Sequence, residues 1–331
     1  RRIMISKRAR TILIIVVVAL FLLCAMAAGG YWATGPSLRC NLPEKGLADE
    51  GWSARIVTAG GVDRCYYLYT PPGYDPSQPA PLVVSFHGFM SNPDSHGLIT
   101  HWHQLAAEEG FLLAYPQGSG YPQRWNAAPG WAVDDVDDVQ FFLDIVADVS
   151  AAASVDPARV YVSGFSNGGG MAERVGCELA DQVAAMGTVA GAVRSMEECS
   201  PSRPVPAMVF HGTADPVVIY EGGEVEHVLI RTIAESIGAS ITFMGAEWVG
   251  TWATLNGCDP TPEALAPSGG VRGLRYTGCR NDAEVIFYAI NEGGHTWPGG
   301  FPIPVGKTSQ DIDATEELWR FFEQHSLDAQ P

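Results

Sequence analysis

The chain has 331 residues, a net charge of −17 and a hydrophobic fraction of 47%. That length is enough for one large domain or two small ones with a sizeable buried core. The hydrophobic fraction is ordinary for a globular protein and argues against general disorder and against a polytopic membrane protein. A chain this acidic lacks the basic surface that binding to phosphates requires, so we predict no nucleic acid partner.

The chain begins with a basic and then an apolar segment. Five Lys and Arg side chains and no acid lie in the first ten residues, and residues 11–24 are almost wholly apolar. Together with the small residues Ala25-Met26-Ala27, this pattern is typical of a secretory signal peptide. The alternative is an uncleaved membrane anchor through residues 11–33, a stretch long enough to span a bilayer. Residues 1–33 are therefore predicted to be a signal peptide or an N-terminal membrane anchor, and either one makes the protein extracellular or bound to the cell surface.

Six of the seven cysteines lie beyond that apolar segment. They are Cys40, Cys65, Cys177, Cys199, Cys258 and Cys279. An even number of cysteines in an exported chain predicts disulfide bonds. The spacing suggests three local pairs but does not choose among the many pairings that six cysteines allow. A zinc site is the alternative, and neither a Cys-x-x-Cys motif nor a nearby Cys/His pair supports it, so we predict no metal and no other cofactor.

Beyond the export segment, residues 34–59 are predicted to be an irregular lead-in. Short β-rich runs then alternate with segments of helical spacing, and several runs are apolar throughout, as in the buried strands of a parallel sheet. The predicted strands are 65–70, 82–86, 111–115, 159–163, 184–190, 207–211 and 284–290. The predicted helices are 136–153, 168–179, 224–237 and 311–325. This alternation predicts an α/β fold, with residues 240–283 as an insertion before the last strand.

The strongest motif in the chain is Gly164-Phe165-Ser166-Asn167-Gly168, which has the pattern Gly-x-Ser-x-Gly. It stands between a predicted strand and a predicted helix, and this context distinguishes a nucleophile elbow from a chance glycine-rich turn. Small neighbours let the serine occupy a sharp, strained turn without clashes. The helix N-terminus then offers backbone N–H groups to a developing negative charge. We therefore predict that Ser166 is a catalytic nucleophile.

A serine hydroxyl needs a base, and the base needs a third group that orients it. In α/β-hydrolases an acid and then a histidine follow the serine along the chain. His295 lies in a glycine-rich loop directly after the last predicted strand, and Asp215 lies in the loop after strand 207–211. Because the carboxyl ends of parallel strands meet at one edge of a sheet, we predict a catalytic triad of Ser166, Asp215 and His295.

Backbone N–H groups beside the serine are predicted to stabilise the oxyanion. Asn167, which follows the nucleophile, supplies one donor by its position, and Gly88 or Phe89, in the loop after strand 82–86, supplies the other. His87 in the same loop is predicted to stabilise the turn. Tryptophans on loops near the site are predicted to line the substrate pocket, where aromatic rings bind acyl or sugar groups. They are Trp125, Trp131 and Trp297.

Several motifs together resemble a known family. They are Val83-Val-Ser-Phe-His87-Gly88, Tyr115-Pro-Gln-Gly118, Val136-Asp-Asp-Val-Gln-Phe-Phe142, Val155-Asp-Pro through Ser166-Asn-Gly-Gly, His211-Gly-Thr-Ala-Asp215 and His295-Thr-Trp-Pro-Gly299. Over roughly residues 60–325 the chain is similar to the polyhydroxybutyrate depolymerase-like esterases. That group includes bacterial feruloyl and acetylxylan esterases of carbohydrate esterase family 1.

The resemblance implies an α/β-hydrolase fold for residues 60–331 and the activity of a secreted serine esterase without a metal. The family's triad falls on the same three residues that the loops predict. It also implies two disulfides, Cys177–Cys199 beside the helix after the serine and Cys258–Cys279 in the insertion. The expected substrates are small-molecule, polysaccharide or polyester esters, such as feruloyl or acetyl esters of plant polysaccharide or polyhydroxyalkanoates.

Two other functions are alternatives to an esterase. One is a serine peptidase on the same fold, and the other is a non-catalytic binding protein of the cell envelope that retains the fold. Candidates for all three triad residues in the required order favour an enzyme over a binding protein. The sequence indicates no protein partner.

Overall fold

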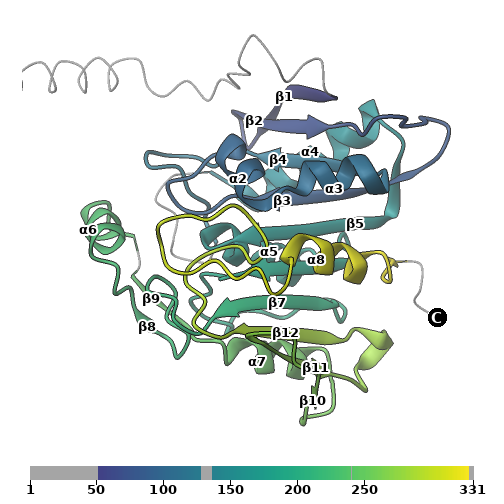
Figure 1. Ribbon diagram of the computed structural model, residues 1–331. Coiled ribbons are helices and arrows are strands. Elements are labelled where there is room, and N and C mark those ends of the chain that lie inside the picture. Colours follow the sequence, from purple (N-terminus) through teal and green to yellow (C-terminus); the bar gives the residue numbers. More distant parts are fainter. Residues whose placement is uncertain (1–50, 128–135, 240, 328–331) are drawn as a thin grey trace, which may run out of the picture. The chain divides into compact units, whose positions relative to one another are not determined.

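A mixed sheet of ten strands lies at the centre of the computed structural model, which describes residues 51–127, 136–239 and 241–327. These ranges belong to one compact unit, Cys40–Pro331. In chain order the strands of the sheet are β1 (Trp52–Ala59), β2 (Val62–Tyr69), β3 (Ala80–Phe86), β4 (Leu112–Pro116), β5 (Val155–Phe165), β6 (Ala185–Val189), β7 (Ala207–Gly212), β10 (Glu263–Ala264), β11 (Val271–Tyr276) and β12 (Val285–Ile290). Across the sheet their order is β1-β2-β4-β3-β5-β6-β7-β12-β11-β10 (Figure 1).

The middle of the sheet is parallel and its two edges are antiparallel. Each neighbouring pair from β4 to β12 runs parallel, whereas β1, β2, β10 and β11 pair antiparallel. All the strands predicted from the sequence are present. The predicted α/β fold with a mostly parallel sheet is therefore confirmed, and the carboxyl ends of its parallel strands meet at one edge.

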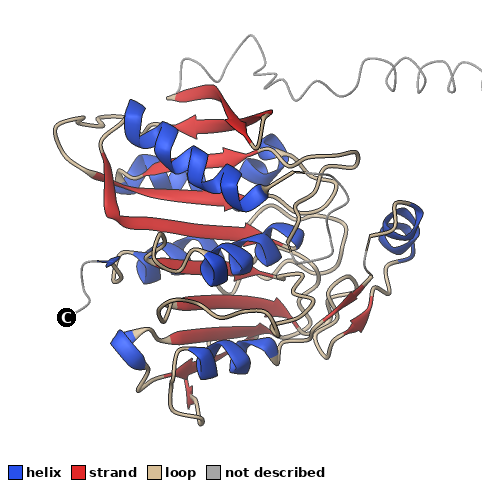
Figure 2. Ribbon diagram, turned by 180° about the vertical axis from the view of Figure 1, so that it is seen from behind, coloured by secondary structure: helices blue, strands red, loops and turns tan. Residues whose placement is uncertain are grey.

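Helices cover both faces of this sheet (Figures 1 and 2). One face carries α2 (Pro93–Thr100), α3 (Trp102–Glu109) and α8 (Ala314–Phe322), and the other carries α4 (Asp138–Ala152), α5 (Asn167–Glu178) and α7 (Trp248–Leu255). Successive side chains of a strand point to opposite faces. In β3, Val84 and Phe86 pack with α4 and α5, while Val83 packs with α3 and α8.

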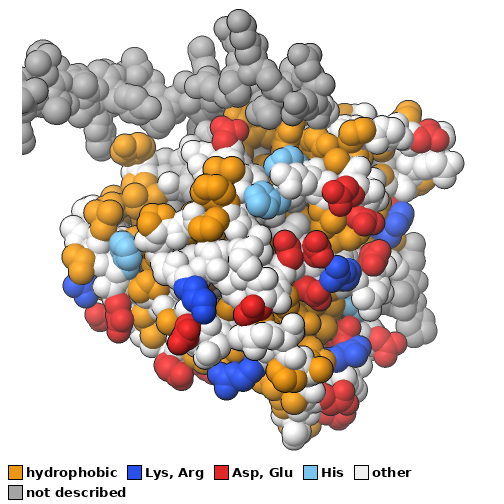
Figure 3. Space-filling model, in the orientation of Figure 1, with side chains coloured by type: hydrophobic (Ala, Val, Ile, Leu, Met, Phe, Trp, Pro, Cys, Tyr) orange, Lys and Arg blue, Asp and Glu red, His pale blue; other side chains and the backbone are white. Residues whose placement is uncertain are grey.

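One helix lies outside these layers. α6 (Val228–Ser236) stands beside a two-stranded sheet of β8 (Gly223–Glu224) and β9 (Thr242–Phe243), away from the main sheet (Figure 1). Val228 is 66% exposed and Leu229 is 62% exposed. Figure 3 shows apolar side chains at the surface where α6 lies in the same view. Within α6 only Ala234 is buried, so this helix packs more loosely than those on the sheet.

The predicted irregular lead-in over residues 34–59 is wrong in its last part, because Trp52–Ala59 forms strand β1. A turn at Gly60 and Gly61 joins β1 to β2, and Ala59 pairs with Val62 across it. Both glycines have positive φ, 59° and 82°, which is the combination that a type I′ hairpin turn requires. Two glycines between β-rich runs are the signal that predicts such a hairpin.

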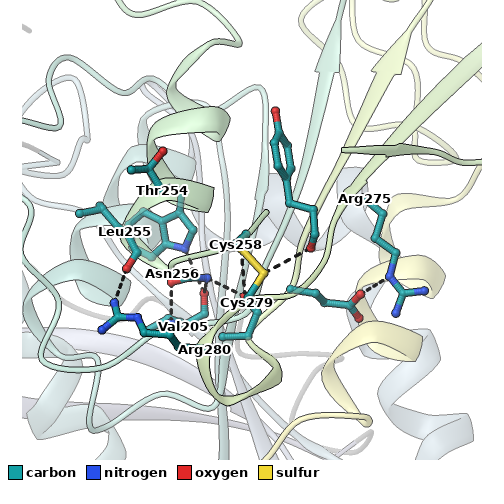
Figure 4. The surroundings of a disulfide bond; sticks show 12 residues. Val205, Thr254, Leu255, Asn256, Cys258, Arg275, Cys279 and Arg280 are labelled. Atoms are coloured by element: carbon teal, nitrogen blue, oxygen red, sulfur yellow. Dashed lines mark hydrogen bonds and ion pairs between the residues drawn. A yellow bond between two sulfur atoms is a disulfide. The ribbon is translucent and has the colours of Figure 1, made fainter. Parts of the chain in front are cut away.

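The predicted insertion over residues 240–283 extends the sheet, because β11 pairs with β12. The disulfide Cys258–Cys279 joins the segment after α7 to the segment after β11 (Figure 4). Next to it, the buried side chain of Asn256 donates to the carbonyl group of Val205 and accepts from its N–H. These contacts fix the insertion to the chain just before β7.

A second disulfide, Cys177–Cys199, joins the last turn of α5 to the loop after β6. The two disulfides are those that the family resemblance implies, and each loop closure is worth about 3 kcal/mol in the chain-entropy model. Cys65 is buried in β2, and Cys40 lies outside the described residues, as do residues 1–33. Among the helices that the structure describes, none is both long and apolar enough to cross a bilayer.

Candidate active site

Ser166 stands at the sharp turn between β5 and α5. Its φ is 57°, a value that strains a residue with a side chain. The glycines on either side permit this turn, because a Cβ at Gly164 would collide with the carbonyl group of Gly168. A Cβ at Gly168 would in turn collide with the carbonyl groups of Phe86 and His87. As the N-cap of α5, Ser166 lies beside backbone N–H groups that have no partner within the helix.

The three predicted triad residues lie in hydrogen-bond contact although they are far apart in the sequence. His295 Nε2 is 2.8 Å from Ser166 Oγ, and His295 Nδ1 is 2.7 Å from Asp215 Oδ2. A carboxylate only accepts hydrogen bonds, so the imidazole carries its proton on Nδ1 and Nε2 accepts from the serine hydroxyl. This arrangement lets His295 take the hydroxyl proton as the serine oxygen attacks a carbonyl carbon.

Asp215 lies in the loop after β7, and the backbone of that loop orients it. Its Oδ1 accepts from the N–H groups of Val217 (2.8 Å) and Val218 (2.9 Å). His211 Nε2 donates to the carbonyl group of Val218 at 2.8 Å, across the same loop. Burial lowers the pKa of His211, which favours the neutral ring. One oxygen of Asp215 is thus held by its own loop, and the other is directed at His295.

The loop after β3 brings Gly88 and Phe89 beside the serine. A Cβ at Gly88 would lie 3.3 Å from Ser166 Cβ, and Phe89 lines the cavity next to Ser166. His87 bonds within its own surroundings, with Nδ1 donating to the carbonyl group of Gly88 (2.7 Å) and Nε2 accepting from Gly118 N–H (2.9 Å). Burial lowers the pKa of His87 to about 4, so the ring is neutral, as these two bonds require. His87 therefore stabilises the turn, as the sequence predicts.

A small apolar cavity of about 30 Å³ adjoins Ser166. Its far wall comes from the segment between the triad acid and α7, which the sequence did not mark as part of the site. The residues of that wall are Val217, Val218, Val225, Ile230, Ala234, Ala239 and Phe243. The cavity volume is close to that of one water molecule, so it fits a methyl-sized group. The apolar residues that follow Asp215 were the only sequence signal for this cavity wall. They did not identify it, because apolar residues in that segment are equally typical of the hydrophobic core.

The prediction that tryptophans line this pocket is wrong for both tryptophans that the structure describes. Trp125 and Trp297 are fully buried and are absent from the cavity wall. The indole of Trp125 donates to the carbonyl group of His87 (2.8 Å), and that of Trp297 donates to Thr315 Oγ1 (2.9 Å). Their loops fold inward, so the rings stabilise the loops that carry the site. Trp131 lies outside the described residues.

His101 and His103 flank Trp102 at the start of α3. His101 lies between α2 and α3 with a φ of 57°, and the ring of His103 packs 5.9 Å from that of Trp52. Within the described ranges, no group of three or more His, Cys, Asp or Glu side chains could hold a metal ion.

Comparison with known sequences places this site in a family of esterases. A family model described as esterase PHB depolymerase matches residues 64–229. Feruloyl esterase B of Piromyces equi is 34% identical over 68% of this chain, and the match spans 41% of that protein's length. Feruloyl esterase C of Emericella nidulans is 31% identical over 85% of this chain and 93% of its own length. The putative esterase NocK of Nocardia uniformis is 31% identical over 83% of this chain and 84% of its own.

Solved structures show the same architecture. The acetyl xylan esterase from Aspergillus awamori superimposes with a TM-score of 0.56 and 14% sequence identity, covering 81% of this chain and 98% of that one. At this level of identity the likeness concerns the fold alone. Together with the mostly parallel sheet and its flanking helices, it identifies an α/β-hydrolase fold.

Proposed function

Because the chain belongs to the esterase PHB depolymerase family of carboxylic ester hydrolases, we propose that it cleaves esters through an acyl-enzyme formed on Ser166. The observation that carries this proposal is the pair of hydrogen bonds that His295 makes, 2.8 Å to Ser166 and 2.7 Å to Asp215. A serine, an imidazole and a buried carboxylate in this order constitute the arrangement that activates a serine hydroxyl.

In the proposed reaction, His295 Nε2 takes the proton of Ser166 as Oγ bonds to the ester carbonyl carbon. The resulting imidazolium faces Asp215, whose negative charge stabilises it. When the tetrahedral intermediate collapses, the C–O bond to the alcohol breaks and His295 returns the proton to the leaving oxygen. A water molecule then attacks the acyl-enzyme by the same two proton transfers and releases the carboxylic acid.

Two backbone N–H groups are proposed to stabilise the oxyanion. Asn167 N–H is one, since it is the first helical amide after the serine. For the other, the geometry favours Phe89 over Gly88. The carbonyl group of Gly88 accepts from His87 Nδ1 and from Ser91 N–H, and in a trans peptide the next N–H points the opposite way. The N–H of Phe89 is thereby directed away from those two donors, and its residue adjoins the cavity at Ser166.

For the substrate, we propose esters of plant polysaccharide that carry a small acyl group. Relatives named as feruloyl esterases and as a bifunctional acetylxylan esterase/xylanase support an ester of plant polysaccharide, and the cavity of about 30 Å³ favours acetyl over feruloyl. A feruloyl ring is larger than this cavity. We also propose that the enzyme works outside the cytoplasm, a setting in which disulfides such as Cys177–Cys199 persist.

The experiment that tests the proposal compares the native protein with Ser166→Ala. The native protein should react with a fluorophosphonate probe and hydrolyse p-nitrophenyl acetate, and the variant should do neither while unfolding at the same temperature. The values of kcat/KM for acetylated xylan, methyl ferulate and hydroxybutyrate oligomers are then compared. Acetylated xylan is expected to give the highest value. Full hydrolysis by the Ser166→Ala variant would contradict the assignment of the nucleophile.

A further inference from the structure

Trp125 connects the two segments that carry the proposed oxyanion donors, the start of α5 and the loop after β3. Its N–H donates to Asn167 Oδ1 at 2.8 Å, and its carbonyl group accepts from Asn167 Nδ2 at 3.1 Å. Its indole Nε1 donates to the carbonyl group of His87 at 2.8 Å. One fully buried residue is therefore bonded to the residue that bears the first donor and to the turn that bears the second.

The hydrogen bond from Trp125 to the carbonyl group of His87 also positions the second donor, the N–H of Phe89, which lies two residues further along the same turn. His87 Nδ1 donates to the carbonyl group of Gly88, whose peptide bond ends at the N–H of Phe89. The indole of Trp125 also packs against the rings of Phe86 and His87, with centroids 4.9 Å apart in both cases. The position of the indole thus determines where this turn lies relative to α5.

The backbone next to Trp125 is hydrogen-bonded to a buried ion pair. The next residue, Asn126, donates its N–H to Asp138 Oδ2 at 2.7 Å. Asp138 Oδ1 accepts from Arg64 Nη2 at 2.8 Å, and both charged side chains are at most 1% exposed. Two charges buried this deeply hold one geometry, since a displacement would leave either of them without its partner. Trp125 is therefore anchored, through Asn126, to this buried ion pair.

We infer that Trp125 is a positioning residue that sets the separation between the two oxyanion donors, Asn167 N–H and Phe89 N–H. This inference rests on the proposed function. An oxyanion hole works only when both donors lie about 2.7–3.1 Å from the oxygen that becomes charged, and loss of one donor lowers kcat roughly 10²- to 10³-fold. Releasing the turn at His87 shifts a donor without removing it, so a smaller loss, of about tenfold to a hundredfold, is expected.

The test compares Trp125→Phe with a matched control, Trp252→Phe. Trp252 is also fully buried, and its indole also donates to a backbone carbonyl, that of Val205 at 3.0 Å. That carbonyl lies just before β7, at the amino ends of the parallel strands, whereas Ser166, Asp215 and His295 lie at their carboxyl ends. Both variants lose one ring and one indole hydrogen bond. The carbonyl group of Val205 keeps a second bond from Asn256 Nδ2, so both variants should lower the melting temperature, Trp125→Phe by more. Only Trp125→Phe should lower kcat for p-nitrophenyl acetate, with KM unchanged, because the donors act in the transition state.

A trifluoromethyl ketone provides a second measurement, because its adduct with Ser166 places an oxyanion between the two donors. Its inhibition constant should increase in Trp125→Phe by the same factor by which kcat/KM decreases. In Trp252→Phe the inhibition constant should stay unchanged. If Trp125→Phe fails to fold, Asn167→Ala replaces it, since this variant keeps the backbone donor and loses both bonds to Trp125. A kcat within twofold of native, or equal losses in the test and control variants, overturns the inference. Activity retained by Ser166→Ala in the same series would instead overturn the proposed function.

Discussion

Replacing Asp215 by asparagine changes one property of the site and leaves its shape intact. Asparagine has nearly the same volume as aspartate, and its Oδ1 can still accept from the N–H groups of Val217 and Val218. The atom that faces His295 Nδ1 at 2.7 Å then becomes an amide nitrogen. Because an amide N–H donates, it pairs with a ring nitrogen that has lost its proton. The imidazole proton moves to Nε2, where it faces the serine hydroxyl and prevents Nε2 from accepting.

The magnitude follows from the loss of this acceptor. A serine enzyme whose histidine is held in the wrong tautomer loses about 10⁴ in kcat, which corresponds to roughly 5 kcal/mol of transition-state stabilisation. KM should change little, since Asp215 is fully buried and does not line the cavity. Thermal unfolding should stay close to that of the native protein. Asp215→Ala should be less stable, because the two backbone N–H groups then lose their buried acceptor.

The assay is the steady-state hydrolysis of p-nitrophenyl acetate, with Asp259→Asn as the control. Asp259 is an exposed acid that also follows Ser166 in the sequence, so its loss should leave kcat unchanged. More than a tenth of native activity in Asp215→Asn would refute the tautomer argument. Equal losses in both variants would show that the acid was misassigned.

Two further predictions concern selectivity and pH. Phe243→Ala removes a ring from the wall of the small cavity. The kcat/KM for p-nitrophenyl butyrate, divided by the kcat/KM for p-nitrophenyl acetate, should therefore rise about tenfold. An unchanged ratio would place the acyl group elsewhere. Burial lowers the pKa of His325 to about 4, whereas the unfolded value is about 6.5. The unfolded chain therefore binds this proton first, and the free energy of unfolding should fall as pH decreases from about 6.5 to about 4. Urea denaturation at pH 6.5 and at pH 4 should show a smaller decrease in the free energy of unfolding for His325→Gln than for the native protein. An equal decrease in both proteins would show that His325 does not contribute to the pH dependence.

The sequence predicts the parallel middle of the sheet and the positions of the three residues of the proposed triad because both follow from local patterns. Apolar runs mark strands that are buried on both faces, and chemistry-bearing side chains follow where those strands end. Ser166 and His295 lie 129 residues apart, yet each is recognisable from its own few neighbours. The antiparallel edge is harder to predict, because β1 carries partly exposed side chains without a continuous apolar run.

The small cavity beside Ser166 was not predictable in the same way. An aromatic residue on a loop near the active site can point into the pocket or into the core, and the sequence is identical in both cases. Trp125 and Trp297 point into the core because each indole N–H finds a buried acceptor there. Over the residues that the structure describes, the cavity wall contains no tryptophan and consists mainly of Val, Ile and Ala side chains together with Phe89 and Phe243. Their role follows only from how β9 and α6 fold back over Ser166.

The separate position of α6 and the two short strands beside it has an evolutionary consequence. The residues of the proposed triad belong to the main sheet and its loops, whereas much of the wall of the cavity beside Ser166 belongs to a small unit outside that sheet. Substitutions in this unit can alter which acyl group fits without disturbing the hydrogen bonds between Ser166, His295 and Asp215. Selection can therefore act on the range of esters accepted while the reaction itself is preserved, and new specificities become reachable through few mutations.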